Sequence, residues 1–198
     1  MNRRSRPPIS VCVFGGATDR GPRAHRAAAA RLGRLMAEAG VELVFGGGRV
    51  GLMGILADAA LGAGGRVVGV IPEHLLKAEV GHGRVSELIV TPDMHERKET
   101  MFARADGFAV LPGGPGTLDE TFEILTWRQL GLHDKPIVIV DLDGYWRPLF
   151  ALVDNLIKRG YARASFRDFF TVVKRVEDVL PTLARLPRAR RPTRLDRL

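Results

Sequence analysis

Short apolar segments alternate with segments of helical spacing along most of the chain. Runs rich in valine and isoleucine, most without polar alternation, are typical of parallel strands buried on both faces. These runs are residues 9–14, 41–45, 66–71, 87–90, 107–111, 136–140 and 169–173. Apolar residues recur with the period of a helix in residues 23–39, 52–61, 94–105, 118–130, 146–158 and 176–186. The alternation predicts right-handed crossovers and an α/β fold, with a doubly wound, mostly parallel sheet flanked by helices.

The length and composition favour one domain. A chain of 198 residues with 45% hydrophobic residues can bury one substantial core, which we place in residues 9–184. No apolar stretch reaches the 18 residues of a membrane span, and the N-terminus has no apolar leader, so we predict a cytoplasmic protein that does not bind membranes. The single cysteine, Cys12, lies in an apolar run and is expected to be a buried thiol.

The positive charge lies at the two ends of the chain. The first eight residues carry three arginines, and residues 185–198 carry six arginines against one aspartate. These two segments account for the whole formal charge of +8, so residues 7–184 are neutral. We interpret residues 1–8 as a flexible basic N-terminus and residues 185–198 as a solvated Arg-rich tail, and we expect no specific binding of nucleic acid.

Glycine-rich turns follow three of the predicted strands, at the edge where open parallel sheets bind ligands. Glycine lets backbone N–H groups approach a ligand closely, and the N-terminus of a following helix favours an anion. The turns are residues 15–18, 46–51 and 112–117. Each alone is equally compatible with a tight connection, but three at one edge favour a phosphate site. No turn is followed by the Lys-Ser/Thr pair of a P-loop, and residues 46–51 fit a dinucleotide fingerprint only weakly.

A candidate catalytic carboxylate follows the third glycine turn. The sequence Thr117-Leu118-Asp119-Glu120 fits a capping box with Thr117 at the N-cap and Glu120 at N3, so a structural role for Glu120 is available. We favour a functional role, because a carboxylate in the first helical turn after a phosphate-binding loop would lie near the sugar of a bound nucleotide.

Two cations fall on the inward side of another predicted helix. Asp93 and Glu96 form a second capping box at its start, and Arg97 and Lys98 lie at the edge of the apolar arc or within it. An unpaired buried charge is costly, so we expect both cations to meet an acidic group or a phosphate, with snorkelling to solvent as the alternative. The five histidines show no ligand spacing with one another or with Cys12, and we predict no metal site and no cofactor.

Three motifs occur in the order of a known family. Residues 112–120 match the PGGxGTxxE signature of the Lonely guy family of cytokinin-activating phosphoribohydrolases. Residues 94–98 match its second signature, and residues 46–54 fit its GGGxxGLMG loop. The resemblance covers residues 9–180. It implies a Rossmann-like fold, a homodimer or a multiple of dimers, and hydrolysis of N6-modified adenosine 5′-monophosphates to the free base and ribose 5-phosphate.

The resemblance also implies site residues. It places the catalytic pair on Arg97 and Glu120. It places the substrate-binding positions on Glu79, Arg97, Lys98, Gly114, Pro115, Gly116, Thr117, Leu118, Asp119, Glu120 and Thr126. One departure follows the first strand, where many members have Cys-Gly-Ser-Ser and this chain has Gly15-Gly16-Ala17-Thr18, so that Thr18 would replace the missing hydroxyl.

Two rival functions remain open. One is a general nucleosidase acting chiefly on AMP, and the other is a non-catalytic carrier of a nucleotide or cofactor. The sequence does not separate the first from the family's activity, whereas the intact pair Arg97 and Glu120 favours an enzyme over a carrier. Lysine decarboxylation, a label often given to such chains, needs a Schiff-base lysine, and only Lys98 lies near a motif, beside Arg97 in an anion site.

Overall fold

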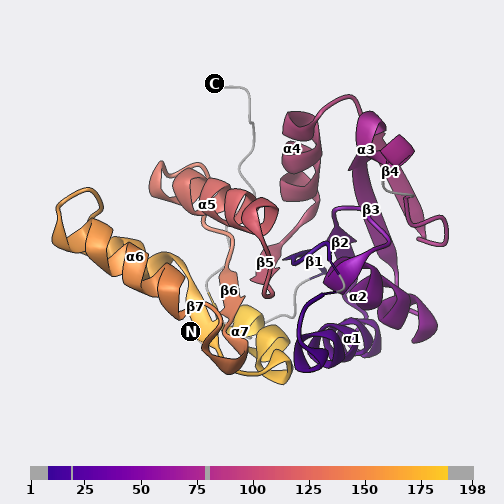
Figure 1. Cartoon of the computed structure of the whole chain (residues 1–198), viewed down its shortest axis with the longest axis horizontal. Helices are drawn as coiled ribbons and strands as arrows, with labels where there is room; N and C mark the ends of the chain where they lie inside the picture. The colour runs from indigo at the N-terminus through magenta and orange to yellow at the C-terminus, as the bar shows by residue number, and fades with distance from the viewer. Residues whose placement is uncertain (1–8, 19, 79–80, 187–198) are drawn as a thin grey trace, which may run out of the picture.

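In residues 9–18, 20–78 and 81–186, which this computed structural model describes, seven parallel strands form one sheet with helices on both faces (Figure 1). The strands are β1 (Ser10–Phe14), β2 (Glu42–Phe45), β3 (Val67–Pro72), β4 (Glu87–Thr91), β5 (Gly107–Val110), β6 (Ile137–Val140) and β7 (Thr171–Val173). The helices are α1 (Arg23–Glu38), α2 (Gly51–Gly62), α3 (Glu73–Ala78), α4 (Met94–Arg104), α5 (Pro115–Gln129), α6 (Arg147–Lys158) and α7 (Val179–Arg185), with 3-10 helices η1 (Leu142–Gly144), η2 (Ala164–Phe169) and η3 (Val176–Asp178). The predicted α/β fold is confirmed.

The strand order creates a topological switch point. The order is β4-β3-β2-β1-β5-β6-β7, so the chain builds outward from β1 in one direction and then returns to build outward on its other side. The register pairs Cys12 of β1 with Val44 on one side and with Phe108 on the other. Ligands of open α/β sheets bind where the order reverses, so the loops after β1 and β5 lie at the expected place for a site.

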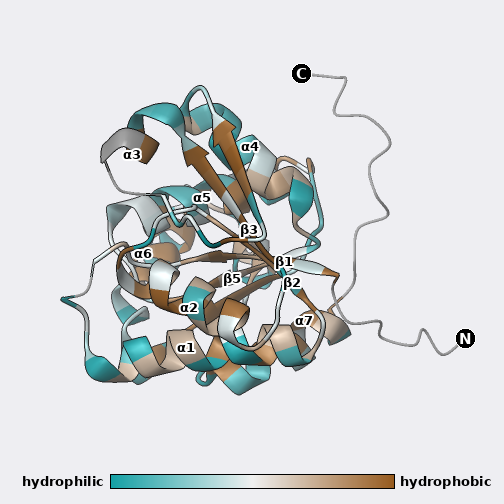
Figure 2. Ribbon diagram, turned by 90° about the vertical axis from the view of Figure 1, so that its right-hand side faces the viewer, coloured by the Kyte–Doolittle hydropathy of each residue, from teal (hydrophilic) through white to brown (hydrophobic). Residues whose placement is uncertain are grey.

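The two faces of the sheet bury two hydrophobic clusters. Val11 and Val13 of β1 pack with α1, α2 and α7, whereas Cys12 and Phe14 pack with α4, α5 and α6. This alternation follows from the two-residue period of a strand. Figure 2 shows the strands as the most hydrophobic part of the ribbon, between helices of mixed character. Burial raises the pKa of the Cys12 thiol, which agrees with the buried, protonated thiol expected from the sequence.

Three differences from the predicted elements stand out, besides shifts of one or two residues at other ends and the unpredicted η1 and η2. The helix expected from residue 118 begins at Pro115, because Gly114 is its N-cap and Pro115 takes the first turn. The helix expected over 176–186 is divided into η3 and α7. The sequence pattern missed α3, which begins directly after Pro72 and is only six residues long.

The ends of the chain fall mostly outside the structure. The predicted flexible segment 1–8 and most of the predicted tail, from residue 187 onward, lie outside the described residues, while α7 continues to Arg185. In the part of the chain that the structure describes, no helix is both long enough and apolar enough to cross a membrane.

Helix α4, which carries the two inward cations, has the predicted N-cap. The Asp93 carboxylate accepts a hydrogen bond of 2.8 Å from the N–H of Glu96. We expect Asp93→Ala to lower the free energy of unfolding by about 1 kcal/mol and the melting point by about 2–4 °C. Asp93→Asn keeps an oxygen that can accept the same bond, so its melting point should match the wild type. Equal melting points for the alanine and asparagine variants would contradict this account of the cap.

Candidate active site

A cavity of about 330 Å³ opens at the switch point, at the carboxyl ends of the strands. The loops after β1 and β5, the start of α5 and the first turn of α4 form most of its wall. It is lined by Gly15, Ala17, Thr18, Met53, Leu75, Met94, Arg97, Gly114, Pro115, Gly116, Thr117, Asp119 and Glu120. The structure therefore brings the predicted catalytic pair and most of the predicted substrate-binding positions together in one place.

The three glycine turns do not contribute equally. The first and third line the cavity and are joined directly, because the N–H of Gly16 donates to the carbonyl of Pro112 at 3.0 Å. The second turn, residues 46–51, instead binds the side chain of Arg97. The carbonyl of Gly46 accepts a hydrogen bond from Nη2 of Arg97 at 3.3 Å. The second turn does not line this cavity, so we place the phosphate at the first and third turns, and the phosphate site itself stays a prediction.

The guanidinium of Arg97 lies against the backbone of Gly46, in space that a side chain at this position would occupy. A Cβ added at Gly46 would lie 1.9 Å from Nη2 of Arg97, so a larger residue there would displace the guanidinium. Nη1 of Arg97 lies 3.5 Å from the sulfur of Met94, and Nη2 lies 3.6 Å from Oε1 of Glu120. Nε of Arg97 is buried without a hydrogen-bond partner among the described residues. Arg97 meets the acidic group that its inward position predicted, and it keeps capacity for a further acceptor.

Glu120 is a buried carboxyl at the wall of the cavity, with 8% of its surface exposed. Burial raises its pKa to about 7, and the nearby charge of Arg97 opposes that rise. The carboxyl is therefore present in both protonation states near neutral pH. A side chain with this property can stabilise a cation and exchange a proton with water or with a leaving group.

Lys98 turns to carboxylates of α5. Its Nζ lies 3.0 Å from Oε1 of Glu123 and 3.3 Å from Oδ2 of Asp119, and it is not among the residues that line the cavity. The prediction that it meets an acidic group is confirmed, whereas its predicted contact with substrate stays a prediction. The two ion pairs fix α4 against α5, and they keep a second positive charge beside Glu120.

The start of α5 is built for an anion, although not by the predicted capping box. Gly114 is the N-cap, and no side chain caps the helix, so the prediction of Thr117 as N-cap is wrong. The reason is that Pro115 and Gly116 already adopt helical geometry, which moves Thr117 into the first turn. The first N–H groups of a helix have no partner within the helix and carry a partial positive charge. Gly114, Gly116 and Thr117, which carry such groups here, all line the cavity.

Three apolar side chains also line the cavity and form what we call its apolar wall. Met53 of α2, Leu75 of α3 and Met94 of α4 line it. None of the three was predicted as a site residue, although Met53 and Met94 both lie inside the recognised motifs. Thr18 also lines the cavity, as its proposed replacement of a hydroxyl requires.

Three predicted substrate-binding positions remain. Leu118 lies on a different groove, and Thr126 is exposed on α5 and does not line the cavity. Their places are explained by helical geometry, because residues two and six positions from Glu120 project from other faces of α5. Glu79 lies outside the described residues. In the described part of the chain, no group of three or more His, Cys, Asp or Glu side chains could hold a metal ion.

Known proteins share both the sequence and the fold. Residues 53–183 match a family described as "Possible lysine decarboxylase". A cytokinin riboside 5′-monophosphate phosphoribohydrolase from Rhodococcoides fascians is 42% identical over 185 residues, which cover 92% of this chain and 93% of the relative. A probable enzyme of the same name from Oryza sativa subsp. japonica is 42% identical over 178 residues, 86% of this chain and 78% of the relative. The Moco carrier protein of Chlamydomonas reinhardtii shares the fold with a TM-score of 0.67 at 22% identity, over 90% of this chain and 96% of that chain.

The raised pKa of Glu120 predicts a specific pH dependence of stability. The folded chain binds the proton of this carboxyl more tightly than the unfolded chain, whose carboxyl has its ordinary pKa of about 4.5. The stability that this difference supplies is complete below about pH 4.5 and is lost as the pH rises through about 7. Glu120→Gln has no such titration. We expect the free energy of unfolding of the wild type, minus that of Glu120→Gln, to fall by about 2–3 kcal/mol between pH 5 and 7.5. Denaturant unfolding at several pH values measures it, and a constant difference would show that Glu120 is not a buried neutral carboxyl at low pH.

Proposed function

Because the chain belongs to the Lonely guy family of cytokinin riboside 5′-monophosphate phosphoribohydrolases, we propose that it hydrolyses the N-glycosidic bond of an N6-modified adenosine 5′-monophosphate. The products are the free base and ribose 5-phosphate. The observation that carries the proposal is the pairing of Arg97 with Glu120 beside the N-terminus of α5, in one cavity. The cytoplasmic location predicted from the sequence remains a prediction.

The first task of the site is to hold the 5′-phosphate. We assign it to the N–H groups at the start of α5, from Gly114, Gly116 and Thr117, together with the Thr117 hydroxyl. Helix N-termini bind phosphate because their free N–H groups and the helix dipole both favour an anion. Binding energy at this remote group is converted into orientation of C1′ at the reacting centre. A nucleoside without the phosphate would lose that orientation.

The second task is to break the bond between C1′ and the purine nitrogen. The bond breaks with the electron pair going to the base, and positive charge develops on the ribose as in other glycoside hydrolyses. The Glu120 carboxylate stabilises that cation and accepts a proton from the attacking water. The departing base takes a proton from solvent, and Glu120 releases its own proton to solvent once ribose 5-phosphate has formed. A carboxyl with a pKa of about 7 suits both roles at neutral pH.

Arg97 keeps part of the Glu120 population ionised at neutral pH. Without the guanidinium 3.6 Å away, burial alone would raise the pKa of Glu120 further and leave too little carboxylate. Arg97 also lines the cavity, so we place its guanidinium near the departing base or the sugar. We place Glu79, which lies outside the described residues, on the ribose or the base.

The rival activities find less support. No lysine is among the described residues that line the cavity, and Lys98 is engaged with Asp119 and Glu123, so the chemistry of a decarboxylase has no Schiff-base lysine there. A carrier would not need a buried carboxyl with a pKa of about 7, such as Glu120, beside an arginine. A general AMP nucleosidase uses the same site and differs only in the preferred base, which the apolar wall of Met53, Leu75 and Met94 would decide.

The reaction is tested with a panel of nucleoside 5′-monophosphates and the matching nucleosides, by measuring free base and ribose 5-phosphate. We expect turnover of the monophosphates and little turnover of the nucleosides. Glu120→Gln should lower kcat/KM by at least about 10²–10³-fold, because it removes the negative charge opposite the developing cation. Arg97→Ala should be similarly inactive. Equal turnover of AMP and adenosine, or wild-type turnover by Glu120→Gln, would contradict the proposal.

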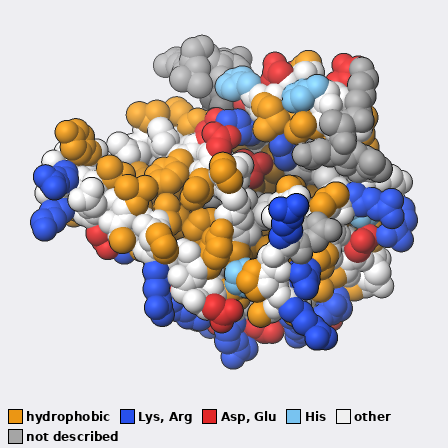
Figure 3. All heavy atoms as spheres, in the orientation of Figure 1, with side chains coloured by type: hydrophobic (Ala, Val, Ile, Leu, Met, Phe, Trp, Pro, Cys, Tyr) orange, Lys and Arg blue, Asp and Glu red, His pale blue; other side chains and the backbone are white. Residues whose placement is uncertain are grey.

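We also propose that the chain forms a homodimer through the faces of α5 and α6. An apolar groove lined by Gly113, Leu118, Phe122, Tyr145, Trp146, Pro148, Leu149 and Leu152 lies between these helices, and Figure 3 shows hydrophobic side chains gathered there. Contiguous apolar surface of this kind marks an interface. Leu118, Phe122 and Thr126 follow one stripe of α5, so the two substrate-binding positions outside the cavity would face the second copy.

The dimer predicts a defined response to charge. Leu152 is 47% exposed in the groove, and Leu152→Glu should convert a dimer into monomers, because an unpaired carboxylate would be buried at the interface. Val90→Glu, at a similarly exposed position on the edge strand β4, is the matched control and should leave the dimer intact. Light scattering at micromolar concentration measures the mass. A wild-type monomer, or a Leu152→Glu dimer, would contradict this interface.

A further inference from the structure

The Tyr145 side chain is hydrogen-bonded to residues 112–117, which we call the phosphate loop. It follows η1 at the carboxyl end of β6, and its hydroxyl donates a hydrogen bond of 2.7 Å to the carbonyl of Gly113. Gly113 immediately precedes Gly114, the N-cap of α5. Neither the motifs nor the helical spacing of the sequence pointed to this residue.

The hydrogen bond to Gly113 also affects Gly114, because the two residues share one peptide group. The carbonyl of Gly113 and the N–H of Gly114 belong to the same planar trans peptide, so they point in opposite directions. Gly113 and Tyr145 line the apolar groove beside α6, whereas Gly114 lines the cavity. A bond that holds the carbonyl toward the groove therefore directs the N–H of Gly114 toward the cavity.

Gly113 itself has no side chain that could restrain its peptide group. A Cβ at this position would lie 2.1 Å from Oγ1 of Thr117, so the loop requires a residue without a side chain. Glycine leaves the peptide free to rotate in the absence of other restraints. The Tyr145 hydroxyl adds a restraint at Gly113 itself, between the hydrogen bonds that hold Pro112 to Gly16 and Gly114 to Leu118.

Tyr145 is itself fixed from several sides. Its ring meets His25 edge-on at 5.7 Å between centroids and Trp146 edge-on at 4.9 Å. Its N–H donates to the carbonyl of Leu142 at 2.9 Å, and the N–H of Trp146 donates to Oδ1 of Asp141 at 2.8 Å. The hydroxyl therefore approaches Gly113 from a turn whose backbone and ring are both restrained.

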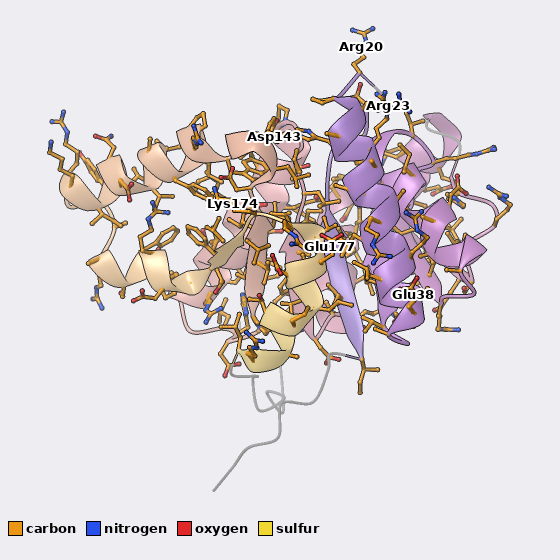
Figure 4. The ribbon with its side chains drawn as sticks, turned by 90° about the horizontal axis from the view of Figure 1, so that it is seen from below. Arg20, Arg23, Glu38, Asp143, Lys174 and Glu177 are labelled. Carbon is orange, nitrogen blue, oxygen red and sulfur yellow. The ribbon has the colours of Figure 1, made fainter. Side chains whose placement is uncertain are left out.

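The turn that presents Tyr145 holds an unusual backbone conformation. Asp143 has φ of 52°, in the left-handed region that residues other than glycine seldom adopt, and Gly144 follows with φ of 76°. Oδ2 of Asp143 lies 3.9 Å from Nε2 of His25, and Figure 4 shows Asp143 beside the N-terminal end of α1. Such strain persists where the surroundings enforce it and is concentrated at functional sites. Tyr145, whose hydroxyl contacts Gly113, follows this segment directly.

We propose that Tyr145 is a positioning residue that aligns the Gly113–Gly114 peptide so that its N–H binds the 5′-phosphate of the substrate. The inference rests on the proposed function, because it needs a phosphorylated ligand at the start of α5. Tyr145 does not touch the substrate. It acts on phosphate affinity through Gly114 and has no part in breaking the glycosidic bond.

Tyr145→Phe removes the hydroxyl and keeps the ring contacts with His25 and Trp146. We expect the dissociation constant for ribose 5-phosphate and the KM for the monophosphate to rise about five- to tenfold, as for the loss of one hydrogen bond at the loop. The value of kcat should fall by a smaller factor than KM rises, because the other N–H groups at the start of α5 still hold the phosphate and orient C1′. The low turnover of the nucleoside should not change. Calorimetry and steady-state kinetics measure the two effects.

The chain provides a matched control, because its only other tyrosine is Tyr161, which is 83% exposed after α6. Tyr161→Phe should bind and turn over like the wild type. If the wild type binds ribose 5-phosphate and Tyr145→Phe binds it equally well, the positioning role is wrong and the proposed function stands. A variant that loses kcat while KM and ribose 5-phosphate affinity stay unchanged would also overturn it. If the wild type binds no ribose 5-phosphate, the proposed function fails, and this inference fails with it.

A second measurement uses the wild type alone and covers the case in which Tyr145→Phe melts much lower. The amide resonance of Gly114 is followed by NMR while ribose 5-phosphate is added. A shift that saturates with the binding curve supports the assignment. A Gly114 resonance that does not move while the ligand binds would overturn it.

Discussion

The burial of Glu120 beside Arg97 is the constraint on which the site depends. A carboxyl removed from water resists ionisation, and a guanidinium at 3.6 Å favours it, so the two effects leave the pKa of Glu120 near 7. The ion pair alone would be weak support for stability, because both charges lose hydration. The ion pair matters for the reaction, because a carboxyl with a pKa near 7 can both stabilise a cation and accept a proton at neutral pH.

The topology of the sheet is what brings the pair together. Arg97 is on α4, which returns the chain from the edge strand β4 to β5, and Glu120 is on α5, which follows β5 directly. The two helices meet beside the switch point, and Lys98 ties them together through Asp119 and Glu123. The glycine at position 46 then admits the guanidinium against the backbone after β2. Residues from three separate segments thus converge because the crossover after β4 passes back over β1.

Much of this could be predicted from the sequence, and the failures have physical causes. The strands and the long helices were readable because burial imposes their periods. Arg97 was readable as a charge on an inward helix face and Glu120 as a carboxylate after a glycine-rich loop, while their role as a pair came from the family resemblance. The start of α5 was misjudged, since Thr117 fits a cap and the true cap, Gly114, has no side chain to reveal it. Tyr145 was missed because its role depends on a contact across 32 residues. No periodicity encodes such a contact, although Asp143-Gly144 after a buried strand did mark a turn at the binding edge.

The loop before α5 separates two surfaces and thereby relates catalysis to assembly. Gly114 lines the cavity, and its neighbour Gly113 lines the apolar groove where we place the second copy. Tyr145 is 43% exposed in a single chain, so water competes for the hydrogen bond between its hydroxyl and Gly113. Covering the groove would exclude that water, and a hydrogen bond strengthens as its surroundings become less polar. On the two proposals together, the dimer would hold the phosphate loop more firmly than the monomer can, even though the reacting groups Arg97 and Glu120 come from the same chain.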